Sequence, residues 1–112
     1  MYIMIAGPYT SGSNDKKQWK RNHEELNRYA YQVFLKGHIP VIGVNVALPI
    51  IEVAGSHMFD DVMMPISLAL AERCDAVLRI GGSSKGADEE VEVFKKRELP
   101  VYYGLNEIPI QH

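Results

Sequence analysis

Two kinds of chemically useful groups lie close together between residues 81 and 90. Residues 81–86 combine three glycines, two serines and a lysine, and the acidic run Asp88-Glu89-Glu90 follows after one residue. Glycines let a ligand approach the backbone closely, and the N–H groups at a helix start attract anions such as phosphate. A carboxylate in the same turns can act as a nucleophile or as a base. The segment therefore predicts a site that holds an anionic ligand beside a reactive acid.

Helical geometry separates Glu90 from its acidic neighbours. At about 100° per residue, Val91 and Phe94 lie within about 40° of Ala87 and define a buried stripe. Glu90 lies about 60° from Ala87, at the border of this stripe, whereas Glu89 points away. Glu90 is therefore the carboxylate expected to face a ligand. The alternative interpretation is a partly exposed helix residue without a chemical role.

A strand and a helix are predicted on either side of this segment. The apolar run 75–80 is typical of a buried strand, and a helical pattern continues to about residue 99. Similar patterns predict strands at 2–6, 39–42 and 100–103, a short last strand at 105–110, and helices at 15–36 and from near Asp61 to 73. Strands that alternate with helices predict an α/β fold: one domain, residues 1–112, with a parallel sheet of four to five strands and helices on both faces.

Residues 43–58 fit no simple pattern. They are strongly apolar, but Pro49, Gly55 and the lack of clean periodicity argue against one long element. We expect an irregular or short-helical excursion that covers a pocket or a subunit partner, because so apolar a surface is costly in water.

Further candidate site residues follow from the predicted topology. The loop at residues 7–14, after the first strand, is rich in turn formers and hydroxyls. It is either a plain connection or part of the site, since loops after parallel strands usually carry the ligand contacts. Asp60 and Asp61 precede a helical pattern, where each is either a cap or a catalytic acid.

Composition excludes several classes of function. The net charge of −2 gives no basic surface for a nucleic-acid polymer, although single nucleotides remain possible ligands. The single cysteine, Cys74, excludes an internal disulfide and is expected to be a small buried hydrophobe. The four scattered histidines suggest no metal site, and we expect no cofactor. No signal-peptide pattern or membrane-spanning run is found, so we expect a cytoplasmic protein without a membrane partner.

Two motifs, in this order and spacing, resemble the nucleoside 2-deoxyribosyltransferase superfamily, which includes the deoxynucleoside monophosphate N-glycosidases. One is the opening Tyr2-Ile3-Met4-Ile5-Ala6-Gly7-Pro8-Tyr9, and the other is Cys74-Asp75-Ala76-Val77-Leu78 followed by Ser84-x-Gly86-x-x-x-Glu90. Together with Gly37-His38-x-Pro40, the likeness covers nearly the whole chain. It implies a flavodoxin-like sheet and cleavage of an N-glycosidic bond.

The resemblance also implies roles for individual residues. Glu90 would attack the anomeric carbon of the sugar, and water or a second base would resolve the glycosyl-enzyme with retention of configuration. Serine at position 84 is similar to members that take 5′-monophosphates, so a 2′-deoxynucleoside 5′-monophosphate is the favoured substrate. The implied substrate-binding residues are Gly7, Tyr9, Ser11, Ser67, Gly82, Ser84, Lys85 and Gly86. A homodimer or higher homo-oligomer is expected, as is usual in this family.

The chain departs from the family at one position. Relatives often carry an aspartate about eight residues before the aspartate of the third strand, and that spacing lands on Ser67 here. A departing base needs an acid, so Asp60 or Asp61 is expected to replace it from the helix start.

Two alternatives remain open. One is a nucleotide-binding sensor without turnover. The other is an enzyme similar to the cytokinin-activating phosphoribohydrolases, because residues 81–86 resemble the Gly-Gly-x-Gly-Thr loop of that family. An acid beside Glu90 would favour catalysis. A salt bridge from Glu90 to Lys85 or Arg79 would favour binding alone.

Overall fold

Four parallel strands form the centre of the fold in this computed structural model, which describes residues 1–111. The strands are β1 (Tyr2–Ala6), β2 (Ile39–Val41), β3 (Ala76–Arg79) and β4 (Val101–Tyr102), in the spatial order β2-β1-β3-β4. The predicted α/β fold with a parallel sheet is confirmed, and it is flavodoxin-like in its strand order. In the described part of the chain, residues 105–110 add no strand, because Leu105–Glu107 form a 3-10 turn instead.

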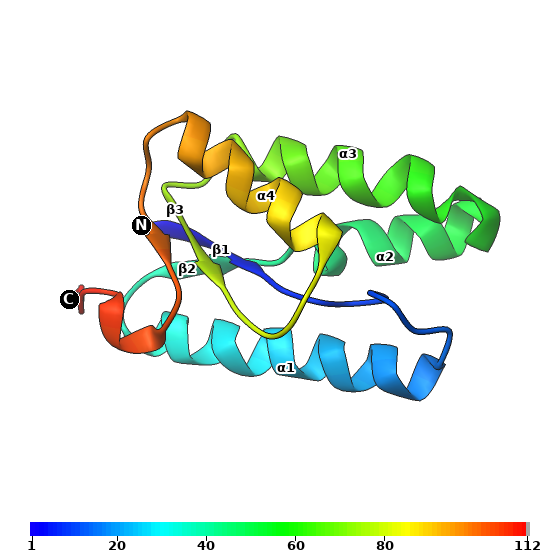
Figure 1. Ribbon diagram of the computed structural model, residues 1–112, viewed down its shortest axis with the longest axis horizontal. Coiled ribbons are helices and arrows are strands. Elements are labelled where there is room, and N and C mark those ends of the chain that lie inside the picture. The colour runs from blue at the N-terminus through cyan, green and yellow to red at the C-terminus, as the bar shows by residue number, and fades with distance from the viewer. Residues whose placement is uncertain (112) are drawn as a thin grey trace.

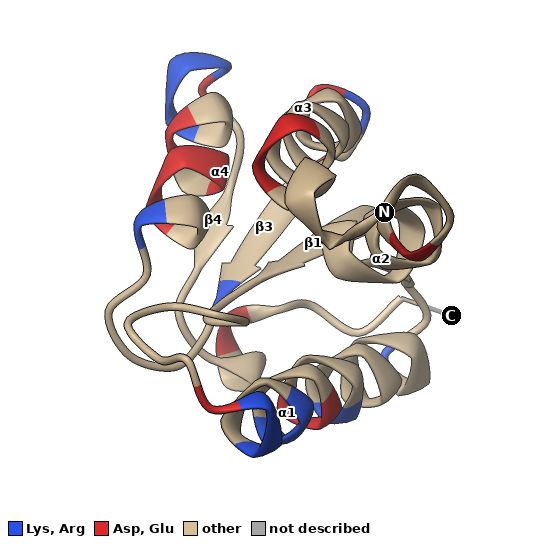
Figure 2. Ribbon diagram, turned by 90° about the vertical axis from the view of Figure 1, so that its right-hand side faces the viewer, with Lys and Arg blue, Asp and Glu red and all other residues tan. Residues whose placement is uncertain are grey.

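Helices cover both faces of the sheet, as predicted. The helices are α1 (Lys16–Leu35), α2 (Gly43–Ala54), α3 (Phe59–Ala71) and α4 (Lys85–Lys96), with a 3-10 turn at Ser56–Met58 between α2 and α3. Helix α1 lies on one face, and α3 and α4 lie on the other, with α2 beside α3 (Figures 1 and 2). No helix among residues 1–111 combines the length and apolar character that a membrane span requires.

The central strand β1 is buried on both faces because its side chains alternate. Ile3 and Ile5 pack into the cluster on the α1 side, whereas Met4 and Ala6 pack into the cluster under α3 and α4. A continuous apolar run is what a parallel strand covered on both sides needs. This explains why the run at residues 2–6 predicted the strand correctly.

After β2 the chain takes the short-helical form, not the irregular one, of the two that were expected for residues 43–58. Residues 43–54 form a regular helix, α2, although Pro49 lies inside it. Proline inside a helix costs about 3 kcal/mol, but Val44 and Ile51 are buried on the inner face of α2, together with Ala47. Each buried Val or Ile side chain contributes about 1.5–3 kcal/mol, so burial outweighs the cost of the proline.

The connections place a crevice above the sheet. From β1 the chain crosses by α1 to β2, and from β3 it crosses by α4 to β4, in the opposite direction. The loops that leave the carboxyl ends of β1 and β3 therefore diverge, which opens a crevice between them. Helices α2 and α3, which connect β2 to β3, close one side of it (Figure 2).

Gly43 begins α2 where this helix passes close to α3. A Cβ atom added at Gly43 would lie 2.0 Å from Oγ of Ser67 and 2.9 Å from its Cβ. Both distances are far inside van der Waals contact, so only glycine fits here without displacing α3.

We therefore expect Gly43→Ala to lower the free energy of unfolding by about 1–3 kcal/mol, the usual cost of overpacking, in urea denaturation. Gly82→Ala is the matched control, because a Cβ atom there meets nothing within 4 Å. The control should leave stability unchanged or raise it by about 0.4–1 kcal/mol. Equal stability of Gly43→Ala and the unmodified protein would contradict the close approach of the two helices.

Candidate functional site

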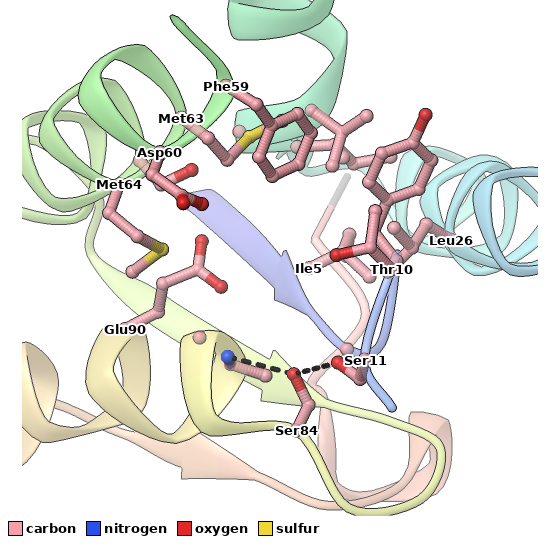
Figure 3. Close-up of a pocket in the computed structure, with 18 residues that line it drawn as sticks. Ile5, Thr10, Ser11, Leu26, Phe59, Asp60, Met63, Met64, Ser84 and Glu90 are labelled. Atoms are coloured by element: carbon pink, nitrogen blue, oxygen red, sulfur yellow. Dashed lines mark hydrogen bonds between the residues drawn. The ribbon is translucent and has the colours of Figure 1, made fainter. Parts of the chain in front are cut away.

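A cavity of about 200 Å³ lies in the crevice above the carboxyl ends of the strands. Four segments line it: the loop after β1, the start of α2, one face of α3 and the first turns of α4. Figure 3 shows their side chains converging from both sides of the crevice. Residues distant in the sequence thus meet at the position where a parallel α/β sheet usually binds its ligand.

Most of the site residues predicted from the sequence line this cavity. They are Gly7, Tyr9, Ser11, Asp60, Ser67, Ser84, Gly86 and Glu90. Three others lie elsewhere. Asp61 and Lys85 are exposed and are not among the lining residues, and Gly82 borders a separate shallow depression beside β4.

Glu90 is a buried acid at the base of the cavity. It lies on the inner face of α4 and is only 8% exposed. Desolvation raises its pKa from the ordinary 4.5 to about 7, although the positive charge of Arg79 and the Ser67 hydroxyl oppose this rise. Among the described residues Glu90 forms no salt bridge, since Arg79 pairs with Asp88. A half-ionised carboxyl group in a cavity is a common property of catalytic acids and nucleophiles.

Helix α3 presents a second carboxylate to the same cavity. Asp60 lies in the first turn of α3, and Figure 3 shows its carboxyl group pointing toward that of Glu90. Ser67 lies two turns further along the same face and is buried. The position where an acid was expected thus carries a hydroxyl group, and an acid enters the cavity from the helix start.

Ser84 connects the two loops at the other end of the cavity. Its Oγ accepts hydrogen bonds from the Ser11 hydroxyl at 3.0 Å and from the Ala87 N–H at 3.2 Å, the second of which caps α4. A hydroxyl group has two lone pairs and one proton. Because both lone pairs are occupied, the Ser84 hydroxyl proton is free to be donated to a ligand. The N–H groups of Ala87 and Asp88 are bonded to Ser84, so the N–H groups of Lys85 and Gly86 are the first-turn donors of α4 that remain for an anion.

An apolar wall completes the cavity, and the sequence did not identify it. Phe59, Met63 and Met64 of α3 line the cavity, and the ring of Phe59 stacks on Tyr9 at 6.3 Å between ring centres. The side-chain amide of Asn22 donates to the Tyr9 carbonyl oxygen at 2.7 Å and holds the loop in place.

A sequence signal for this wall does exist. Residues 60, 63, 64 and 67 recur at spacings of three and four, which is the spacing of one helix face. Two polar residues on the same face as two methionines indicate a face that meets a cavity rather than a dry core.

Metal and thiol chemistry find no support in this region. Among residues 1–111, no group of three or more His, Cys, Asp or Glu side chains is arranged to hold a metal ion. Cys74 is buried, and desolvation raises the pKa of its thiol to about 11, so it is a small packing residue as predicted. His23 is partly buried and bonds to the side chain of Asn45 rather than to a site group.

The buried acid makes stability depend on pH. Because the pKa of Glu90 is about 7 in the folded protein against an ordinary 4.5, the folded state holds the extra proton between these values. The contribution of Glu90 to the free energy of unfolding therefore falls as pH rises through this window. At about 1.4 kcal/mol per pKa unit, the fall is about 3 kcal/mol.

Glu90→Gln removes this ionisation, so its stability relative to the unmodified protein is expected to rise by about 1–3 kcal/mol between pH 5 and pH 8 in urea denaturation. Glu89→Gln is the matched control, because Glu89 is adjacent and exposed. The difference in the free energy of unfolding between this variant and the unmodified protein should stay constant over the same pH range. A constant difference for Glu90→Gln as well would show that Glu90 is not desolvated.

Comparisons with known proteins give no assignment. No family model, no curated protein and no solved structure matches the chain.

Proposed function

We propose that the protein cleaves or transfers the N-glycosidic bond of a nucleotide or nucleoside, with a 2′-deoxynucleoside 5′-monophosphate as the favoured substrate. The observation that carries the proposal is the buried Glu90 carboxylate in a cavity that it shares with Asp60. The cavity volume of about 200 Å³ suits a pentose, and the phosphate and the base are proposed to extend from it toward α4 and toward Phe59.

The phosphate is proposed to bind at the start of α4. The hydroxyl proton of Ser84 and the N–H groups of Lys85 and Gly86, at the start of the helix, are donors of the kind that a phosphate prefers. Ser11 holds the Ser84 hydroxyl in this orientation. Lys85 is exposed at the same helix end, where it contributes charge to the approach of an anion rather than a lining contact.

The base is proposed to occupy the end of the cavity that Phe59 and Tyr9 line. Stacked aromatic rings and the two methionines of α3 offer a flat apolar surface of the kind on which nucleobases stack. Asp60 lies on the same face of α3 as Met63 and lines the cavity (Figure 3). A base and a sugar bound in this way would meet beside its carboxyl group.

The proposed reaction has two steps. The ionised Glu90 carboxylate attacks the anomeric carbon, forming a C–O bond while the C–N bond to the base breaks, and Asp60 supplies the proton that the departing base takes up. Water, or a second base, then attacks the same carbon and gives its proton to the Asp60 carboxylate, while the C–O bond to Glu90 breaks and releases Glu90 as a carboxylate. Two inversions give net retention of configuration.

Two further properties are proposed alongside the reaction. The single, buried, unpaired cysteine fits a reducing compartment such as the cytoplasm. A homodimer is proposed because Val46, Ile50 and Val53 form an exposed apolar stripe on α2, which carries only one charged residue, Glu52 (Figure 2).

Base release should depend on Glu90. With a panel of deoxynucleoside monophosphates, chromatography of the products is expected to detect free base from the unmodified protein and at least about a thousandfold less from Glu90→Gln, which lacks the nucleophile. Glu89→Gln should retain full activity. Because attack requires the ionised form and the pKa of Glu90 is about 7, kcat/KM should increase with pH through about 7.

Adjacent aspartates provide a second matched pair in the same assay. Asp60→Asn should slow base release by about a hundredfold or more, the usual contribution of a general acid. Asp61→Asn should have little effect, because Asp61 does not line the cavity.

Undiminished release by Glu90→Gln would remove Glu90 from the mechanism. Tight nucleotide binding in calorimetry without release would favour the sensor, and release from ribonucleotides alone would favour the phosphoribohydrolase.

The apolar stripe on α2 predicts association. Light scattering at micromolar concentration is expected to give the mass of a dimer or larger oligomer, and Ile50→Asp should shift it to the monomer because a charge would be buried at the interface. Tyr103→Asp is the control, since Tyr103 is also exposed but lies next to β4, at the other edge of the sheet. A monomer in the unmodified protein would contradict the proposed dimer.

A further inference from the structure

Arg79 is a largely buried cation at the carboxyl end of β3. Strand side chains alternate between faces, and Val77, two residues earlier, packs with Phe94 under α4, whereas Leu78 packs on the α1 side. The Arg79 side chain therefore extends toward the face that α4 covers, and only 11% of it is exposed. Its guanidinium group lies at the strand-to-helix connection that the candidate site uses.

The guanidinium group ties this connection together at three points. Nη1 donates to the carbonyl oxygen of Ile80, Nη2 donates to that of Gly82 at 2.8 Å, and Nε donates to Oδ1 of Asp88 at 3.2 Å. The first two partners precede the helix and the third lies in its first turn. The planar, forked geometry of arginine allows this, and the single ammonium group of lysine does not.

The three bonds differ in strength. The Asp88 side chain is 70% exposed, so its ion pair with Arg79 is screened by solvent and contributes little. Apart from the Arg79 bonds, the side-chain hydrogen bonds that hold this loop in the described structure are those of Ser84 to the Ser11 hydroxyl and to the Ala87 N–H. The carbonyl contacts are therefore the ones that fix the loop, and with it the start of α4.

Arg79 also acts on Glu90 through its charge. Burial favours the neutral acid, and the positive charge of Arg79 favours the carboxylate. The other charged groups on the helix turns around Glu90 are all exposed: Asp60 and Asp61 at the start of α3, and Lys85, Asp88, Glu89 and Glu92 on α4. The loop after β1 faces the cavity with hydroxyl groups and Tyr9. Arg79 is the buried cation of this set.

We propose that Arg79 is a positioning residue for the reaction: its guanidinium group fixes the connection that carries Ser84 and Glu90, and its buried positive charge favours the carboxylate form of Glu90. This inference rests on the proposed function, since a nucleophile must be ionised to attack. It assigns Arg79 two separable contributions, one through hydrogen bonds and one through charge, and different substitutions remove them.

The charge is tested by titrating Glu90, which needs no turnover. Carbon-13 NMR of protein labelled at the glutamate side chains, with the Glu90 signal assigned by its loss in Glu90→Gln, gives the titration midpoint. Arg79→Gln is expected to raise this midpoint by more than any change in the controls, because a buried positive charge that favours the carboxylate is lost. Arg79→Lys should leave it near the original value. The control Asp88→Asn, which removes only the exposed ion pair, should leave it within a few tenths of a unit.

Base release then separates the two contributions. Arg79→Gln should shift the rising limb of the kcat/KM profile to higher pH by the same amount as the midpoint, and Arg79→Lys should lower kcat about tenfold or more at every pH without shifting the limb, because the loop contacts are lost. An unchanged Glu90 midpoint in Arg79→Gln would overturn the role of the charge. Full activity of Arg79→Lys would overturn the role of the hydrogen bonds.

Two further outcomes are decisive. Arg79→Met retains the packing of the aliphatic stem and replaces Arg79→Gln if that variant unfolds, and failure of both neutral variants to fold would make Arg79 purely structural and overturn the proposal. If the unmodified protein releases no base but its Glu90 midpoint still responds to Arg79, the proposed function fails while the coupling stands.

Discussion

Desolvation of a single carboxylate is the constraint on which the rest of the site depends. Removing Glu90 from water destabilises its charged form. A hydrophobic residue at this position would cost less free energy of folding, so the rest of the fold must compensate for the buried acid. The neighbours of Glu90 act in opposite directions: the Met64 side chain and the helix surfaces exclude water, whereas Arg79 and Ser67 support the charge. A reactive group at near-neutral pH results from this balance rather than from any one contact.

The arrangement of helices maintains that balance. Helix α4 contacts both β1 and β3, and helix α3 contacts both α2 and α4. The glycine at the start of α2 lets α2 and α3 approach, so Ser67 is held next to the cavity. A Cβ atom at Gly86 would touch Sδ of Met64 at 3.4 Å, an ordinary contact distance, so α3 and α4 are already in contact at the cavity floor. The shape of the cavity is therefore set by backbone packing.

Sequence patterns predicted the parts of this structure that depend on local or periodic signals. The inward orientation of Glu90 followed from its position around the helix axis relative to Ala87. The alternation of strands and helices followed from the alternating apolar and helical patterns. The sequence left both an irregular and a short-helical form open for α2, because the unfavourable proline is visible in the sequence whereas the compensating burial of Val44 and Ile51 arises only in the tertiary structure. The choice between Asp60 and Asp61 likewise depends on which way the first turn of α3 faces, and adjacent residues cannot be distinguished until that rotation is known.

The position of β1 in the middle of the sheet has a consequence for the order of folding. Its register pairs Tyr2 with Ile39 on one side and Ile3 with Ala76 on the other, so its second neighbour enters the chain only after β2, α2 and α3. Closing so long a loop costs conformational entropy before any contact compensates for it, which makes such pairings slow to form. The loops that carry Tyr9 and Ser84 follow β1 and β3, so they meet only when this pairing is made. A complete but partly folded chain therefore contains every residue of the site but has no cavity until β1 and β3 pair.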